Sequence, residues 1–159
     1  MFLVTKTFEN IVTHSPICAL DLCILNEKNE LLLGKRKNPP AKGYFFVPGG
    51  RLRKGETLNL ATNRLLKSEL NYELPEKNFE KIKLLGAFEH FYDENFLGNK
   101  SFSSHYLIIA YSISLSFLNK KCTDSFNDQH EKYLWYNNKL EKDIKIHPYV
   151  NKYLKKIKL

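Results

Sequence analysis

Apolar residues along the chain gather in runs separated by polar breaks, and these runs predict a series of strands. Residues 17–25 are almost entirely apolar, and residues 31–37 form a second run after the polar turn 26–30. Residues 44–47 predict a short strand that Pro48 ends, because proline donates no hydrogen bond to a strand ladder. Three later runs also predict strands, over residues 83–92, 104–115 and 133–136.

Two other segments carry apolar residues at helical spacing. Residues 57–70 repeat leucine and alanine on one side, and Asn71 and Pro75 mark the end of that run. Residues 147–158 place apolar side chains on one side and lysines on the other, which predicts an ordinary surface helix. A nucleic-acid or membrane face is the alternative interpretation of this basic helix. The mixture of elements predicts an α/β (α+β) fold with a mixed sheet between helices.

Two connecting segments have the character of loops. Residues 49–55 begin with a glycine pair and predict a loop between the third strand and the first helix. Residues 117–132 form a long polar connection, and loops of that length in a compact domain often carry function. His130 lies in this connection beside Gln129, so we do not expect it in the core.

The composition limits the class of protein. A chain of 159 residues with 43% hydrophobic content suits one domain, over residues 1–159, and excludes a disordered tail. No apolar run reaches the length of a membrane span, and the N-terminus lacks the layout of a signal peptide. No cysteine and histidine spacing typical of a zinc site occurs. We therefore expect a cytoplasmic protein.

The net charge of +8 has two interpretations, a solvated lysine-rich surface or an anionic partner. The positions of the arginines favour a partner of a particular kind. All of them lie in one short segment, as Arg36, Arg51, Arg53 and Arg64. Arginine makes planar, bidentate contacts with phosphate, whereas lysine acts as a point charge. We therefore expect a small phosphate-bearing ligand near residues 36–64 rather than a diffuse nucleic-acid surface.

A spaced set of residues surrounds the glycine pair. Five residues separate Gly50 from Glu56, and seven more separate Glu56 from Arg64. This resembles the Nudix box, which reads Gly, five residues, Glu, seven residues, Arg-Glu, an aliphatic residue, any residue, Glu-Glu, any residue, Gly and an aliphatic residue. Leu66 also matches the box, and the preceding FVPGG of residues 46–50 is typical of that family.

The box has lost two carboxylates. Leu65 and Ser68 stand where glutamates are expected, Asn71 replaces a glycine, and Glu69 remains. Positions 65, 68 and 69 share one helix face, so three glutamates there would hold several divalent cations. Glu69 alone can contribute to a single Mg²⁺ site if other oxygens complete it. The alternative is that Glu69 is an ordinary solvated glutamate.

The whole chain through Trp135 is similar to a Nudix branch with the same depleted box, the GDP-mannose mannosyl hydrolases. The matching stretches are MFL at the N-terminus, LLLGKR (31–36), GYFFVPGGR (43–51), EHFYDENF (89–96), SHY (104–106) and DQHEKYLW (128–135). The resemblance implies a Nudix-like mixed sheet between helices. It also implies a homodimer that binds a small-molecule nucleotide sugar, with no nucleic-acid or membrane partner.

The resemblance also implies roles for individual residues. The Mg²⁺ ligands would be the backbone carbonyl of Gly49, Glu69 and Gln129, and His130 would be the general base. The other implied roles are contact with the diphosphate for Arg36, Arg51 and Tyr106, the nucleotide pocket for Phe2, Leu3 and Phe8, and the neighbourhood of the sugar for Asp21 and His90.

For some of these residues a purely structural role is the alternative. Asp21 interrupts an apolar strand, and a buried carboxylate needs a partner, for which Arg64 or a histidine is available. His90 could be a hydrogen-bonded structural group of its strand. Glu56 and Arg64 are expected to form an ion pair that braces the loop on the helix.

The implied reaction is hydrolysis of GDP-mannose or a related GDP-hexose to GDP and free sugar. A neutral histidine suits activation of water near pH 7, and attack on the anomeric carbon would proceed with inversion. One alternative is a Nudix pyrophosphohydrolase that cleaves between the phosphates. Another is a non-catalytic protein that binds nucleotide sugar or RNA.

Overall fold

The computed structural model describes residues 5–120, 130–137 and 144–159. Its main sheet contains β1 (Ile17–Leu25), β2 (Leu31–Arg36), β3 (Phe45–Phe46), β4 (Gly49–Arg51), β6 (Lys83–Tyr92), β7 (Ser104–Ser114) and β9 (His130–Tyr136). The strands follow the order β3-β2-β1-β7-β6, with β4 paired to β1 and β9 paired to β2. Strands β1 and β7 run parallel, and the other pairs are antiparallel, so the sheet is mixed.

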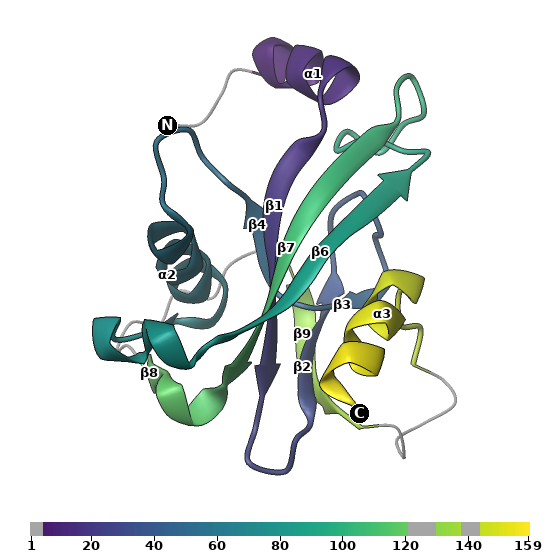
Figure 1. Ribbon diagram of the computed structural model, residues 1–159. Coiled ribbons are helices and arrows are strands. Elements are labelled where there is room, and N and C mark those ends of the chain that lie inside the picture. The colour runs from purple at the N-terminus through teal and green to yellow at the C-terminus, as the bar shows by residue number, and fades with distance from the viewer. Residues whose placement is uncertain (1–4, 121–129, 138–143) are drawn as a thin grey trace.

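Three helices of the described residues lie around this sheet, with α2 on one side and α3 on the other (Figure 1). They are α1 (Thr5–His14), α2 (Leu58–Leu70) and α3 (Pro148–Ile157). The remaining elements are a small sheet of β5 (Tyr72–Glu73) and β8 (Asn119–Lys120), and the 3₁₀ turns Glu76–Lys81 and Leu115–Phe117. Within the described ranges, no helix is both long and apolar enough to cross a bilayer.

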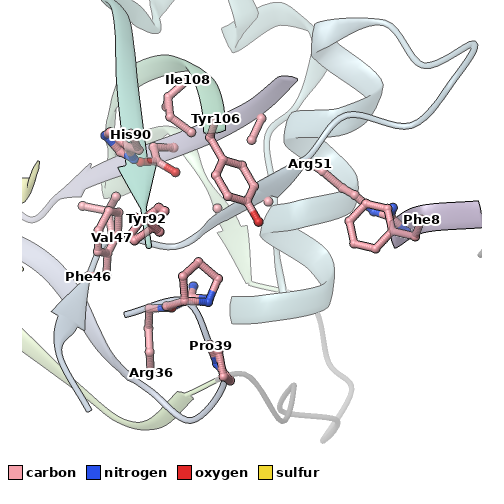
Figure 2. A pocket seen from close by; sticks show the side chains of 15 residues that line it. Phe8, Arg36, Pro39, Phe46, Val47, Arg51, His90, Tyr92, Tyr106 and Ile108 are labelled. Carbon is pink, nitrogen blue, oxygen red and sulfur yellow. The ribbon is translucent and has the colours of Figure 1, made fainter. Parts of the chain in front are cut away.

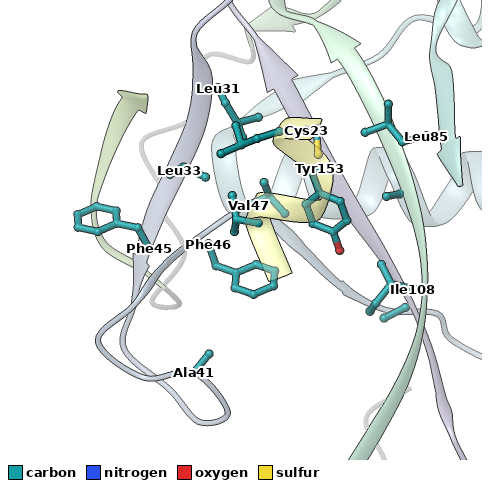
Figure 3. Packing of buried hydrophobic residues seen from close by; sticks show 14 residues of the cluster. Cys23, Leu31, Leu33, Ala41, Phe45, Phe46, Val47, Leu85, Ile108 and Tyr153 are labelled. Carbon is teal, nitrogen blue, oxygen red and sulfur yellow. The ribbon is translucent and has the colours of Figure 1, made fainter. Parts of the chain in front are cut away.

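Strand β1 is buried on both faces, which explains its nearly continuous apolar run. Ala19 and Cys23 pack into a cluster with α3, and Figure 3 shows part of it around Tyr153. Leu20 and Leu22 alternate with them and pack on the other face, against α2. Because side chains alternate along a strand, Asp21 points to the same face as Ala19 and Cys23.

The predicted fold class is confirmed. Five predicted strands and both predicted helices occur within two residues of their expected positions. The predicted end of the first helix has a specific cause, since Asn71 adopts the left-handed conformation with φ 57°. The Nudix box carries glycine here, and asparagine is one of the few other residues that tolerate this backbone at a helix C-terminus. Helix α1 was not predicted, although Phe8, Ile11 and Val12 lie at helical spacing; of its residues only Val12 is buried.

The loop expected over residues 49–55 is wrong for its first three residues. Gly49–Arg51 forms strand β4, whose Gly49 pairs with Asp21 of β1. A Cβ on Gly49 would lie 2.6 Å from Asp21 Oδ1 and still closer to the Leu20 carbonyl oxygen. Only glycine therefore permits this close pairing, which a reading of local composition cannot reveal.

The expectation that His130 lies in a polar loop is also wrong. Strand β9 begins at His130, three residues before the predicted start, and its side chain is buried. The pairing of β2 with β9 shifts register between Gly34 and Arg36, opposite this residue. A Cβ on Gly34 would lie 2.5 Å from His130 Cδ2, so the glycine leaves the space that the imidazole fills.

Candidate active site

A cavity of about 260 Å³ opens between the sheet, the N-terminal helix and the segment after β2 (Figure 2). Strands β1, β2, β4, β6 and β7 all contribute to its wall. The wall contains seven of the residues to which the resemblance assigns a role, namely Phe8, Asp21, Arg36, Gly49, Arg51, His90 and Tyr106. The structure thus brings together side chains that lie up to 98 residues apart in the chain, from Phe8 to Tyr106.

Two guanidinium groups face this cavity from opposite strands of its wall. The Nε–H of Arg36 donates to the Pro40 carbonyl oxygen at 2.9 Å, and the guanidinium of Arg51 lies 4.0 Å from the centre of the Phe8 ring. Burial raises the pKa of the Tyr106 hydroxyl, which keeps it a hydrogen-bond donor at neutral pH. Two cations and a donor around one cavity suit a diphosphate.

Asp21 and His90 meet at the inner wall through a third side chain. The hydroxyl of Tyr153 donates to Asp21 Oδ2 at 2.5 Å and lies 3.0 Å from His90 Nε2. Asp21 was expected to pair with Arg64 or a histidine, and that expectation is wrong because Arg64 binds Glu56 and a tyrosine separates Asp21 from His90. Burial raises the pKa of Asp21 to about 7 and lowers that of His90 to about 3, so this histidine is neutral.

Glu69 is buried at the C-terminal end of α2, with 1% of the residue exposed. Neither carboxylate oxygen has a hydrogen-bond partner of good geometry among the described residues. Burial raises its pKa to about 8, while the nearby Gly49 amide and Arg36 act in the opposite direction. His130 Nδ1 lies 3.7 Å from Glu69 Oε2, which is too far for a hydrogen bond. A buried carboxylate without a hydrogen bond of good geometry is costly unless a cation compensates it, so Glu69 fits a metal ligand and not a solvated glutamate.

The other implied metal ligands are only partly described. Gly49 lines the cavity and offers a backbone carbonyl, a hard oxygen ligand of the kind that Mg²⁺ accepts. Gln129 lies outside the described residues, as do Phe2 and Leu3 of the expected nucleotide pocket. The described part of the chain contains no cluster of three or more His, Cys, Asp or Glu side chains able to hold a metal.

His130 lies beside Glu69 and does not line the cavity. Its Nδ1 is 3.0 Å from the Tyr133 hydroxyl, which donates to the Glu69 carbonyl oxygen at 3.1 Å. Because that hydroxyl proton is already engaged, Nδ1 must carry the proton of the imidazole and Nε2 is left as an acceptor. Nε2 is buried and has no partner among the described residues. Burial, together with Arg36 and Lys37, lowers the pKa of His130 to about 4.

The expected brace between loop and helix is confirmed. Glu56 and Arg64 form an ion pair in which Nη2 donates to Glu56 Oε2 at 2.8 Å and Nε donates to Oε1. Nη2 also donates to the Arg51 carbonyl oxygen at 3.0 Å, and the Arg53 amide donates to Glu56 Oε2 at 3.0 Å. The pair therefore fixes the backbone that carries Arg51 into the cavity.

This brace leads to a prediction on acid stability. Hydrogen bonding to Arg64 lowers the pKa of Glu56 from 4.5 to about 2, so the ionised pair stabilises the fold above pH 4.5 and is lost as the pH falls toward 2. We expect Glu56→Gln to lower the free energy of unfolding at pH 7 by about 1–2 kcal/mol, after allowance for solvent screening near the surface. Urea unfolding at pH 7 and pH 3 would measure it; an equal loss at both pH values would contradict the assignment.

Three residues of the site were missed in the sequence. Tyr92 lines the cavity, and its position two residues after His90 on the same strand was the signal that places both on one face. Tyr133 orients His130, and its signal was only that it follows three residues later in the same segment. Tyr153 touches Asp21 across 132 residues of chain, and no sequence pattern indicates that contact.

Comparison with known proteins shows which family this chain belongs to. A model of the NUDIX domain matches residues 17–148, which include every described strand of the main sheet and helix α2. The chain belongs to the NUDIX family. A relative from Haloferax volcanii, the low-salt glycan biosynthesis protein Agl8, is 36% identical over 147 residues, which cover 92% of this chain and 85% of that protein.

Solved NUDIX structures share the fold at lower identity. A NUDIX hydrolase from Nitrosomonas europaea superposes with a TM-score of 0.65 at 17% identity, covering 89% of this chain and 88% of that one. The MutT protein from Methanosarcina mazei Go1 gives a TM-score of 0.62 at 17% identity, with 91% and 95% covered. NUDIX membership supports a hydrolase that acts on a diphosphate compound with a divalent metal ion.

Proposed function

We propose that this NUDIX protein hydrolyses a GDP-hexose, first of all GDP-mannose, to GDP and free sugar with the help of Mg²⁺. The observation that carries the proposal is that α2 keeps one buried carboxylate, Glu69, which does not line the cavity but lies beside Gly49 of its wall. Leu65 is buried among apolar side chains, and the Ser68 hydroxyl donates to the Leu65 carbonyl oxygen at 3.3 Å. Neither replaces a metal-binding glutamate, so the several-metal arrangement suited to attack at phosphorus lacks two of its ligands on this helix and keeps only Glu69.

The cavity wall suggests how the substrate lies. Arg36 and Arg51 bind the diphosphate, and Tyr106 donates a further hydrogen bond to it. Asp21 and His90, at the inner wall, bind the sugar. Phe8 stacks under Arg51 at the side where the nucleotide enters, and Phe2 and Leu3 are proposed to extend that wall.

The metal position follows from Glu69. Its carboxylate, the Gly49 carbonyl and the Gln129 side chain would hold Mg²⁺, and the fit rests on the unpartnered buried carboxylate. When bound, Mg²⁺ neutralises charge that develops on the departing nucleoside diphosphate. With that leaving group stabilised by two arginines as well, the reaction needs no general acid.

His130 is proposed as the general base. Tyr133 holds its Nδ1–H, and Nε2 is therefore the atom that accepts a proton from water. The activated water attacks the anomeric carbon on the face opposite the diphosphate, so the sugar is released with inverted configuration. The new bond forms between water oxygen and carbon, and the carbon–oxygen bond to the diphosphate breaks.

Two further expectations accompany the proposal. The name of the Haloferax volcanii relative refers to glycan biosynthesis, which agrees with a nucleotide-sugar substrate. The preference for guanine follows from the resemblance to the mannosyl hydrolases. A homodimer and a cytoplasmic location remain predictions, which size-exclusion chromatography with light scattering and cell fractionation would test.

Hydrolysis in ¹⁸O-labelled water tests the bond that breaks. We expect the label in the sugar and unlabelled GDP, with the inverted anomer released first, which mass spectrometry and NMR would record. Label in a phosphate group, with GMP and sugar phosphate as products, would favour the pyrophosphohydrolase. That alternative is supported by an ADP-ribose pyrophosphatase of Methanocaldococcus jannaschii that is 46% identical over 54 residues, 34% of this chain and 31% of that protein. If the protein turns over no substrate and binds RNA with a steep salt dependence, the non-catalytic binding protein would be favoured.

A further inference from the structure

Helix α3 reaches the cavity although it begins where the family match ends, at residue 148. Its Tyr153 is completely buried within the cluster of Figure 3. Tyr153 does not line the cavity, but its hydroxyl contacts two residues that do, Asp21 and His90. The helix therefore acts on the cavity from behind its wall, and it is more than the ordinary surface helix expected from its sequence.

The order of protons in this contact follows from the donors available. A tyrosine hydroxyl has one proton, and that of Tyr153 is donated to Asp21 Oδ2. The same oxygen lies 3.0 Å from His90 Nε2, so with Asp21 ionised the imidazole must donate from Nε2–H. The histidine is thereby fixed as the Nε2–H tautomer, with Nδ1 left as an acceptor. This is the opposite tautomer to that of His130, which Tyr133 fixes as Nδ1–H.

The burial of the contact makes the hydroxyl hard to replace. Asp21 is 6% exposed and His90 is 2% exposed, so water has little access to the atoms that face Tyr153. Without the hydroxyl, a carboxylate oxygen and an imidazole N–H would each lose a buried partner. Both side chains could then turn toward the cavity or toward each other, and their geometry at the cavity wall would no longer be unique.

We propose that Tyr153 is a positioning residue that holds Asp21 and His90 in the orientation that receives the sugar. Asp21 presents its other oxygen, and His90 its Nδ1 acceptor, to hydroxyl groups of the sugar. The substrate class is thus a sugar with hydroxyls able to donate to two acceptors, bound at the end of the cavity that α3 supports. The inference rests on the proposed function for the sugar, but the tautomer that Tyr153 imposes is independent of it.

Tyr149 provides a matched comparison on the same helix. Its hydroxyl accepts from the Phe91 amide at 2.8 Å and donates to the Phe91 carbonyl oxygen at 2.9 Å. Its ring stacks on His90 with the centres 4.0 Å apart. Replacement by phenylalanine therefore removes two hydrogen bonds in each case and keeps the aromatic packing, but only the change at position 153 affects Asp21.

Kinetics of the two variants with GDP-mannose and Mg²⁺ test the positioning. For Tyr153→Phe we expect kcat to fall roughly 10- to 100-fold, since small misplacement of reacting groups has effects of that size. We expect the Kd of GDP, measured by calorimetry, to stay within about twofold, because the diphosphate contacts are untouched. For Tyr149→Phe we expect Tm to fall about as much as in Tyr153→Phe, but kcat to change little. An unchanged kcat for Tyr153→Phe, or an equal loss in Tyr149→Phe, would overturn the proposal.

A spectroscopic measurement decides the matter without turnover. In protein labelled with ¹⁵N at histidine, we expect the shifts of His90 to report a proton on Nε2, and the Tyr153→Phe variant to lose this single tautomer. A wild-type His90 protonated on Nδ1 would overturn the positioning role. If the wild-type protein releases no free sugar while this tautomer is present, the proposed function fails and the role of Tyr153 in ordering the cavity wall stands.

Discussion

Replacement of His130 by alanine is expected to lower kcat by about 10²- to 10⁴-fold, the range found when a general base is removed. The reason lies in the arrangement around the ring. Tyr133 occupies Nδ1, Nε2 has no partner among the described residues, and the low pKa of about 4 leaves the imidazole unprotonated at pH 7. No other described side chain beside Glu69 offers a comparable free nitrogen acceptor.

Steady-state kinetics and a binding measurement would separate base catalysis from a loss of structure. We expect the Kd of GDP with Mg²⁺ to change by less than about threefold, because Arg36 and Arg51 remain in place. The control is His14→Ala, since His14 is exposed at the end of α1 and lies outside the cavity. A His130→Ala variant that keeps its rate would remove this residue as the base.

Replacement of Glu69 by glutamine is expected to remove the stabilisation of the folded protein by Mg²⁺. Saturation of a site at about 100 times its Kd raises the free energy of unfolding by about 2.7 kcal/mol, which appears as a higher Tm. We expect this Mg²⁺-dependent shift in the wild-type protein and its loss in Glu69→Gln. Titration of Tm against Mg²⁺ would measure it, with Glu76→Gln as the control because Glu76 is exposed on a 3₁₀ turn.

Without metal, Glu69→Gln should be more stable than the wild-type protein. Burial raises the pKa of Glu69 from 4.5 to about 8, so the folded protein holds a proton that the unfolded chain releases between these pH values. The metal-free wild-type protein should therefore lose stability as the pH rises from 4.5 to 8. At pH 8 we expect Glu69→Gln to be more stable than wild type by about 2–3 kcal/mol in EDTA. A variant that is less stable in EDTA, or that keeps the Mg²⁺ shift, would contradict a metal-binding role.

The main sheet and α2 could be predicted because their signals are local. Strand β1 is buried on both faces and reads as an apolar run, and α2 has a regular apolar repeat that ends at Asn71. Helix α1 was not predicted because only three of its ten residues, Phe8, Ile11 and Val12, are apolar. Strand β4 escaped because its three residues pair only when β1 is already beside them, and Gly49 gives no apolar signal.

In the candidate site, too, some features could be predicted from the sequence and others depended on tertiary contacts. The clustering of the arginines indicated a phosphate site, and the spacing of the box indicated the remaining glutamate of α2. The resemblance to the mannosyl hydrolases then selected Arg36, Arg51 and Gly49. Contacts between distant residues were not predictable. The burial of His130 depends on the space beside Gly34, and the partner of Asp21 is a tyrosine 132 residues away. Amino-acid types therefore decided which functional groups this NUDIX protein has, whereas the folded packing decided their protonation and orientation, because both depend on neighbours that only tertiary contacts supply.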